Sequence, residues 1–129
     1  MREVKFKIYL QHEETGIVCS KVFSYDCLFS GAAKFALETE FKRRFVIGKA
    51  EFTGLKDKDG KEIYEGDIIV CSGNKTMFGE VIFENGQCVY IHRGISNKDY
   101  NNGELIPVGY GYKIIGNIYE NPELLKNEI

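Results

Sequence analysis

The sequence predicts a compact, mainly β protein built from many short antiparallel strands, and three observations lead to this fold class. Fourteen glycines accompany eight Tyr and nine Phe in 129 residues, a composition that favours short strands and tight turns over a helical bundle. Several segments alternate apolar and polar residues, which is the period of a half-buried strand. Asn85-Gly86 is the strongest short hairpin signal in the chain.

The N-terminal part predicts a β-hairpin followed by a helix. Residues 4–10 form the first expected strand, and residues 17–25 form the second, with a turn at Glu14-Thr15-Gly16. From Ser30 the apolar period becomes helical, with Ser30 as the N-cap. The basic run 42–44 closes this helix at the end where the helix dipole favours cations.

The central part predicts an extended segment, a double turn and a meander. Residues 45–53 are extended, with an interruption at Gly48. Asp57-Lys58-Asp59-Gly60 predicts a turn, because Asp tolerates the left-handed region and Gly occupies it without steric cost. Glu65-Gly66-Asp67 makes a second bend before the buried strand 68–71. The segments that follow, 79–83 and 88–92, continue the meander around Asn85-Gly86.

The C-terminal part predicts a long loop, a last strand and a short helix. Residues 94–109 are polar and rich in Asn and Gly, as in a functional loop. Residues 110–119 form the strand, and Asn121-Pro122-Glu123 begins the helix, with Asn as cap and Pro at the first helical position. We therefore expect one domain over 1–129: an N-terminal hairpin and helix over 1–50, and a β core with a short C-terminal helix over 51–125.

Composition limits the classes of partner. The net charge of −2 comes from 17 basic and 19 acidic side chains, which gives no global case for binding nucleic acid or an anionic membrane. No segment reads as a signal peptide or approaches the roughly 20 apolar residues that span a bilayer. We expect a cytoplasmic protein whose four cysteines, which include no CxxC pair, are free thiols.

Candidate catalytic and metal groups have simpler explanations. A calcium loop with Gly60 at its sixth position would begin at Leu55 and end at Gly66, where acidic ligands are required, so Asp57 and Asp59 are explained by turn chemistry.

Two other pairs of side chains are also weak candidates for catalytic groups. Cys88 and His92 would lie about 13 Å apart on one strand, too far for a nucleophile and its base. The carboxylates of Glu65 and Asp67 could supply an acid and a base, but a turn explains Asp67. We expect no catalytic residue, no metal and no cofactor.

One basic group offers a case for nucleic acid. It consists of Lys42, Arg43, Arg44 and Lys49, interleaved with the aromatic residues Phe41 and Phe45. Clustered cations bind phosphates, and aromatic rings stack on unpaired bases. The alternative, which the overall charge favours, is a solvated helix end with its aromatic rings in the core.

Three blocks carry a family resemblance. They are MREVKF at 1–6, FTGLKDKDGKEIYEGDII at 52–69 and GNIYENPELL at 116–125. In this order they resemble the YopX family, whose members are encoded largely by bacteriophages and prophages. The matching turn positions are Gly54, Asp57, Gly60, Gly66, Asp67, Gly116, Asn121 and Pro122. Residues 7–45 depart from the family pattern.

The resemblance implies a small SH3-like or pseudo-barrel of antiparallel strands, capped by a helix, that forms a homo-oligomer in a bacterial host. It implies no known activity and no catalytic residues. Our first hypothesis is a non-catalytic binding or assembly module that self-associates or meets a phage or host protein. The alternative is a single-stranded nucleic-acid-binding accessory protein of phage replication, which would use Lys42, Arg43, Arg44 and Lys49.

Overall fold

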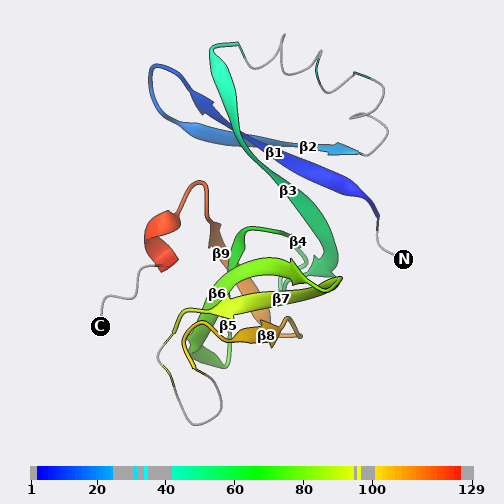
Figure 1. The fold of residues 1–129 in the computed structure, drawn as a ribbon, viewed down its shortest axis with the longest axis vertical. Coiled ribbons are helices and arrows are strands. Elements are labelled where there is room, and N and C mark those ends of the chain that lie inside the picture. The colour runs from blue at the N-terminus through cyan, green and yellow to red at the C-terminus, as the bar shows by residue number, and fades with distance from the viewer. Residues whose placement is uncertain are drawn as a thin grey trace. The chain divides into compact units, whose positions relative to one another are not determined.

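The computed structural model describes residues 3–24, 31, 34, 42–94, 96 and 101–125, and this part of the chain is mainly β. It forms two antiparallel sheets (Figure 1). The chain divides into two compact units, Met1–Phe52 and Thr53–Ile129. We predicted one domain made of an N-terminal part over 1–50 and a β core over 51–125, and this organisation stays a prediction. No helix in the described part has the length and apolar content needed to cross a membrane.

The first unit contains the predicted N-terminal hairpin. Strand β1 (Lys5–His12) pairs with β2 (Val18–Ser24), from Lys5 opposite Ser24 to Gln11 opposite Val18. The turn is closed by Gly16, whose N–H donates to the His12 carbonyl at 2.9 Å. The prediction of this hairpin is confirmed. The helix predicted from Ser30 lies outside the described residues, apart from positions 31 and 34.

Strand β3 (Arg44–Lys56) pairs with the other edge of β1 and contains a β-bulge. Tyr9 lies opposite Gly48, whereas Leu10 lies opposite Val46, so Ile47 is the extra residue. The interruption predicted at Gly48 is therefore a change of register. Strand β1 lies between β2 and β3, and its adjacent residues Tyr9 and Leu10, whose side chains point to opposite faces of the strand, are each 1% exposed.

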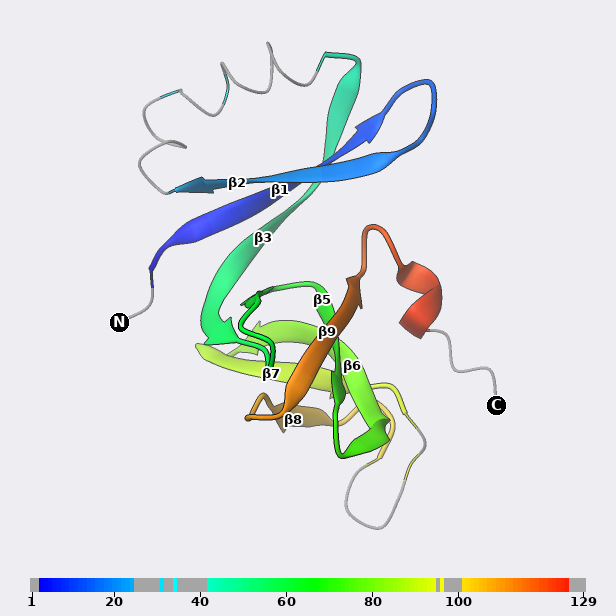
Figure 2. The same ribbon diagram turned by 180° about the vertical axis from the view of Figure 1, so that it is seen from behind.

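The second unit begins within β3, whose last residues precede the strand β4. Its remaining elements are β4 (Glu62–Tyr64), β5 (Asp67–Cys71), β6 (Asn74–Glu84), β7 (Gln87–His92), β8 (Leu105–Pro107), β9 (Tyr112–Asn117) and the 3-10 helix η1 (Pro122–Leu125). Strands β8, β7, β6, β5 and β9 form a sheet in that order, and Figure 2 shows β9 crossing its near side before the chain reaches η1. The core of the unit is formed by Ile63, Ile69, Met77, Val81, Tyr90 and Ile106.

Local signals predicted most of this unit. Asn85 and Gly86 both have positive φ, 52° and 78°, as the predicted two-residue hairpin turn requires. The short terminal helix is confirmed as one 3-10 turn that starts at Pro122. The helix cap and the SH3-like closure of the barrel stay predictions.

The long loop predicted over 94–109 is wrong in its last part. Residues 105–107 form β8, in which Ile106 pairs with Tyr90 and is only 4% exposed. The polar residues around this short strand concealed it, because burial of the single side chain of Ile106 gives no detectable period. Residues 95 and 97–100 of that segment lie outside the described part of the chain.

Candidate anion-binding surface on the second unit

The turn at residues 57–60 is fixed by the carboxylate of Asp57. One oxygen accepts hydrogen bonds from the N–H groups of Asp59 and Lys61, both at 2.9 Å, and the other accepts from Ile114 at 3.1 Å. The Lys58 N–H donates to the Tyr112 carbonyl at 2.9 Å. A turn and a strand that are far apart in the sequence are thus joined, with Lys58 beside the start of β9.

The electrostatics of Asp57 follow from these contacts. Burial by itself would raise the pKa of this carboxyl. The backbone N–H groups of Ile114, Lys61 and Asp59, together with the charge of Lys61, outweigh burial and hold the pKa below its ordinary value. Asp57 is therefore an ionised anchor whose charge is already solvated by the protein.

Beside this anchor lies a recess of about 440 Å³, which we call the lysine hollow. It is lined by Lys58 from the turn, Lys75 from β6, Lys113 from β9 and the β5 end around Cys71 and Ser72. The sheet register explains the convergence, because Val70 pairs with Lys113 and Cys71 pairs with both Asn74 and Tyr112. Strand β5, which lies between β6 and β9, thus brings lysines from its two neighbours to one end of the sheet.

The three lysines of the hollow have no partner carboxylate within the described ranges. The ion pairs found there involve Lys5 and Arg43 instead. The nearby carboxylate of Asp57 is occupied by its three N–H donors. Uncompensated positive charge in a recess attracts anions, even on a protein whose net charge is −2.

A second recess, of about 650 Å³, adjoins the first and shares Lys58 with it; we call it the tyrosine hollow. Its walls include Leu55, Lys56, Asp57 and Tyr110. Tyr110 is fully exposed, at 105% of its reference area, and Leu55 is 38% exposed. Both volumes lie in the range of ligand-binding recesses in proteins.

Some turn residues of the three sequence blocks shape this surface, and the others shape the fold. Gly54, Asp57 and Gly60 line the tyrosine hollow. The Asp67 carboxylate accepts a hydrogen bond from the Tyr64 N–H at 2.8 Å, which holds the bend between β4 and β5.

The side chain of Asn121 occupies the space beside Gly116, which explains why position 116 is a glycine. A Cβ at position 116 would lie 2.5 Å from Oδ1 of Asn121, and that oxygen accepts a hydrogen bond from the Asn117 N–H at 3.3 Å. Only glycine leaves room for this contact. Pro122 follows as the first residue of η1.

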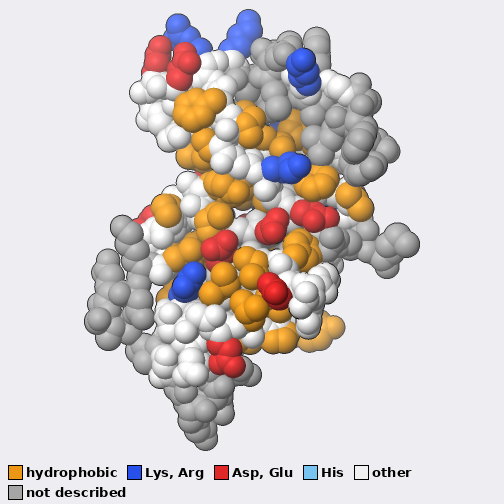
Figure 3. All heavy atoms as spheres, in the orientation of Figure 1, with side chains coloured by type: hydrophobic (Ala, Val, Ile, Leu, Met, Phe, Trp, Pro, Cys, Tyr) orange, Lys and Arg blue, Asp and Glu red, His pale blue; other side chains and the backbone are white. Residues whose placement is uncertain are grey.

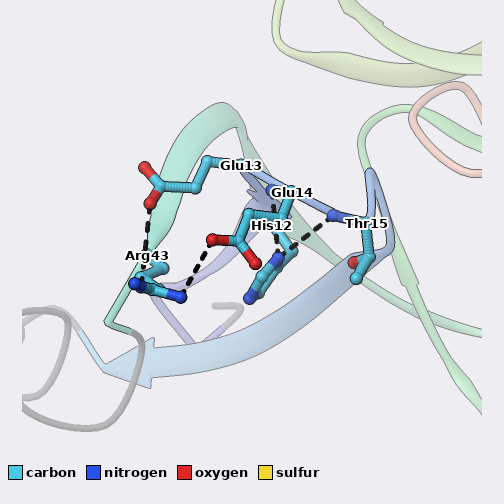
Figure 4. Close-up of polar contacts among 5 residues, drawn as sticks. All are labelled: His12, Glu13, Glu14, Thr15 and Arg43. Carbon is cyan, nitrogen blue, oxygen red and sulfur yellow. Dashed lines mark hydrogen bonds and ion pairs between the residues drawn. The ribbon is translucent and has the colours of Figure 1, made fainter.

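The basic group that the alternative reading assigned to nucleic acid is placed in the first unit, and its members differ in their surroundings. All four side chains, Lys42, Arg43, Arg44 and Lys49, are exposed. Figure 4 shows Arg43 between two acidic side chains, with Nη1 2.9 Å from Oε1 of Glu14 and Nε 4.0 Å from Oε1 of Glu13.

The other members of this group are spread along the sheet. Arg44 pairs with His12, while Lys49 pairs with Ile8. These partners are four residues apart on β1, about 13 Å at the usual strand rise. The Lys49 ammonium lies 5.1 Å from the centre of the Phe6 ring. Lys42 and Arg44 form no ion pair with a described residue. Because Arg44 and Lys49 are far apart along β3, the four basic residues do not form one compact cluster.

A polar cluster that the sequence did not reveal surrounds Gly66. The Gly66 N–H donates to the Val81 carbonyl at 2.8 Å, and the Gly66 carbonyl accepts from Ile118 at 2.9 Å. The neighbours of these three residues, Glu65, Glu80 and Tyr119, are consequently close in space. Figure 3 shows acidic side chains among hydrophobic ones over β6 and β7.

Burial, and after it the charges of neighbouring residues, shifts the pKa values of two groups in this cluster. Burial, opposed by Arg93 and reinforced by Glu65, raises the pKa of Glu80. Burial and then the charges of Glu65 and Glu80 raise the pKa of Tyr119. The sequence had paired Glu65 with Asp67, but Asp67 is 3% exposed and bonded to the Tyr64 N–H, and the electrostatic partner of Glu65 is Glu80.

The remaining candidate groups stay separate. Within the described ranges no three His, Cys, Asp or Glu side chains are arranged to hold a metal ion. His92 is fully buried, whereas Cys88 is partly buried. The register places His92 opposite Gly79 and Cys88 opposite Phe83. Cys19, Cys71 and Cys88 are free thiols, and Cys27 lies outside the described residues.

Sequence reasoning missed the lysine hollow because Lys58, Lys75 and Lys113 are far apart in the chain. Two signals could have pointed to this surface. Lys56 and Lys58 lie inside the block 52–69, and Tyr110 stands between two glycines in a segment otherwise expected to be a strand. Neither signal places the residues together without the order of the sheet.

The fold and this surface define a class, a small protein of two compact β units whose second unit presents a lysine-lined recess. A family model described as "YopX protein" matches residues 7–126. The chain therefore belongs to the YopX family, which confirms the resemblance. The match contains the blocks at 52–69 and 116–125 and begins just after the block at 1–6. It also takes in residues 7–45, which the sequence analysis had set apart from the family pattern.

Other comparisons concern the fold alone. The crystal structure of protein EF1440 from Enterococcus faecalis is similar, with 20% sequence identity and a TM-score of 0.50. The match covers 98% of this chain and 100% of that chain. A comparison with curated proteins finds no match.

Proposed function

We propose that this YopX-family protein is a non-catalytic binding module of a phage or prophage, and that it binds single-stranded nucleic acid in the host cytoplasm. The observation that carries the proposal is the lysine hollow, in which Lys58, Lys75 and Lys113 converge. Phosphate groups are the anions that a polymer supplies at regular intervals, and lysine neutralises them as a point charge. An accessory role in phage replication fits such a partner.

The concave shape favours a single strand over a duplex. The three lysines are among the residues that line a recess of about 440 Å³. A duplex is a broad, stiff rod that presents its phosphates on a convex surface, so it cannot follow this recess without deformation. A single strand is flexible and can direct consecutive phosphates inward.

The test is charge reversal at matched positions. We expect the Lys58→Glu, Lys113→Glu double variant to bind a labelled thymidine oligonucleotide at least tenfold more weakly, as measured by fluorescence anisotropy, because two phosphate contacts are lost. The control is Lys42→Glu with Arg44→Glu, which makes the same change of charge at exposed residues of the first unit. Equal weakening in both double variants, or no binding by the wild type, would refute the proposed site.

Self-association is a second candidate function, and the edge of the first sheet favours it. Within the described part, β2 pairs only with β1, and it carries Val22, which is 43% exposed. Phe45 and Val46 of β3 are 50% and 54% exposed. An open edge strand with exposed apolar residues is a template for pairing with a second copy of the chain.

We expect light scattering during size-exclusion chromatography to show a homo-oligomer at roughly micromolar protein concentrations. Val22→Lys should shift it toward the monomer, because a charge on the edge prevents strand pairing. Leu105→Lys changes a similarly exposed residue on β8, which is an edge strand of the other sheet, and it should leave the oligomer unchanged if the copies pair through β2. A wild-type protein that stays monomeric contradicts this candidate.

A further inference from the structure

Tyr110 is the most exposed large hydrophobic side chain in the described part of the chain. It stands between Gly109 and Gly111 directly before β9, and Gly111 has a φ of 83°. A full aromatic ring in water forgoes the burial that makes aromatic residues stabilising. Tyr110 is one of the residues that line the tyrosine hollow, and Leu55 is another.

We infer that Tyr110 is a stacking platform for an unpaired nucleobase, an inference that rests on the proposed function. The ligand class is thereby narrowed from any polyanion to single-stranded nucleic acid that has exposed bases. Base-on-aromatic stacking tolerates every sequence, because each base has a π-face. We therefore expect Tyr110 to stack on any base, without a preference for sequence.

The arrangement of the two hollows supports this assignment. They share Lys58, so a phosphate held at Lys58 lies at the border between the lysine hollow and the tyrosine hollow. Along a nucleic-acid strand each phosphate is followed by a sugar that carries a base, and the same alternation of charge and ring occurs here.

The tyrosine hollow can also accept a ligand of this charge. Lys56 adds a further cation to its wall. The one carboxylate among its lining residues, Asp57, has its two oxygens bonded to three N–H groups and so repels a ligand less than an unsolvated charge would.

The competing occupant is an acidic peptide, which would use the lysines but would gain nothing specific from Tyr110. A thymidine oligonucleotide and an abasic oligonucleotide of equal length distinguish the two cases, because they carry the same phosphates and differ only in their bases. Polyglutamate serves as the peptide probe. The full-length protein is titrated with each probe by fluorescence anisotropy.

We expect Tyr110→Ala to weaken binding of the thymidine oligonucleotide by about tenfold, as for the loss of one base stack, and to leave binding of the abasic one unchanged. Tyr110→Phe keeps the ring and should retain the affinity. Because Tyr110 is fully exposed, neither variant removes a core contact, and circular dichroism confirms that each one is folded.

Each contrary result has a distinct meaning. If Tyr110→Ala binds the thymidine oligonucleotide as the wild type does, the stacking role is wrong, while the lysine-dependent binding stands. If the wild type binds the thymidine, abasic and polyglutamate probes equally, the surface is a general polyanion site and the inference is overturned. If the wild type binds no oligonucleotide, the proposed function itself is wrong.

Discussion

Asp57 sets the geometry of the binding surface at the scale of single residues. Its carboxylate joins the turn at 57–60 to β9 through the Ile114 N–H, and this contact places Lys58 beside Lys113. The residue is only 7% exposed, so its hydrogen bonds replace those that water would provide. Asp57 thus positions two lysines that we propose to bind phosphate, without being proposed to contact the ligand itself.

We predict that Asp57→Asn destabilises the protein by about 1–3 kcal/mol in urea unfolding, because the amide NH₂ cannot accept the bonds that the second oxygen accepts. The control Asp59→Asn, at an exposed position of the same turn, should stay within about 0.5 kcal/mol of the wild type. Equal effects of the two variants would show that the Asp57 contacts contribute nothing.

The pH dependence of this contribution follows from the lowered pKa of Asp57. A carboxyl whose pKa is lower in the folded state stabilises the fold at pH values above its unfolded pKa, about 3.9. That stability is lost as the pH falls from there through the folded pKa. The difference between wild type and Asp57→Asn should therefore narrow in acid, which urea unfolding at a series of pH values measures.

At the scale of elements, β6 separates two environments. Its odd-numbered residues Met77 and Val81 enter the core, whereas Glu80 lies on the opposite face, near Glu65 and Arg93. The raised pKa of Glu80 means that the folded state disfavours its ionised form. Its effect on stability is greatest in acid and declines as the pH rises from the unfolded pKa, about 4.3, through the folded pKa.

Glu80→Gln should consequently stabilise the protein at neutral pH, by a few tenths of a kcal/mol for a partly exposed charge, or about 1–2 °C in Tm. The gain should vanish below about pH 4, where the wild-type carboxyl is protonated in both states. Glu84→Gln, at the exposed end of the same strand, is the control for thermal unfolding. A loss of stability in Glu80→Gln at neutral pH would mean that attraction to Arg93 dominates.

The strands and turns also show which parts of the fold can be predicted from the amino-acid sequence. The hairpin at Asn85-Gly86 and the turn at Asp57 to Gly60 depend on residues that are adjacent in the chain, so local chemistry identified them. Strand β8 exists because Ile106 pairs with Tyr90, a contact that no local period encodes. The bulge at Ile47 is likewise a matter of register between two strands.

At the scale of the whole molecule, charge is distributed differently from what the net value suggests. The chain has a net charge of −2, yet one end of the second sheet gathers three lysines without carboxylate partners in the described residues. Predicting that cluster requires knowing that β5 lies between β6 and β9. The contiguous run 42–44 is easily seen in the sequence, but its middle residue is neutralised by Glu13 and Glu14.

The salt dependence of oligonucleotide binding tests the central claim most directly. For a single strand, log K falls with log salt concentration by about 0.7 for each phosphate neutralised. We predict that Lys58→Glu with Lys113→Glu makes this slope shallower by about 1.4, and that Lys42→Glu with Arg44→Glu leaves it unchanged. A wild-type affinity that does not vary with salt, or a slope that changes only in the Lys42 and Arg44 variant, would contradict the account.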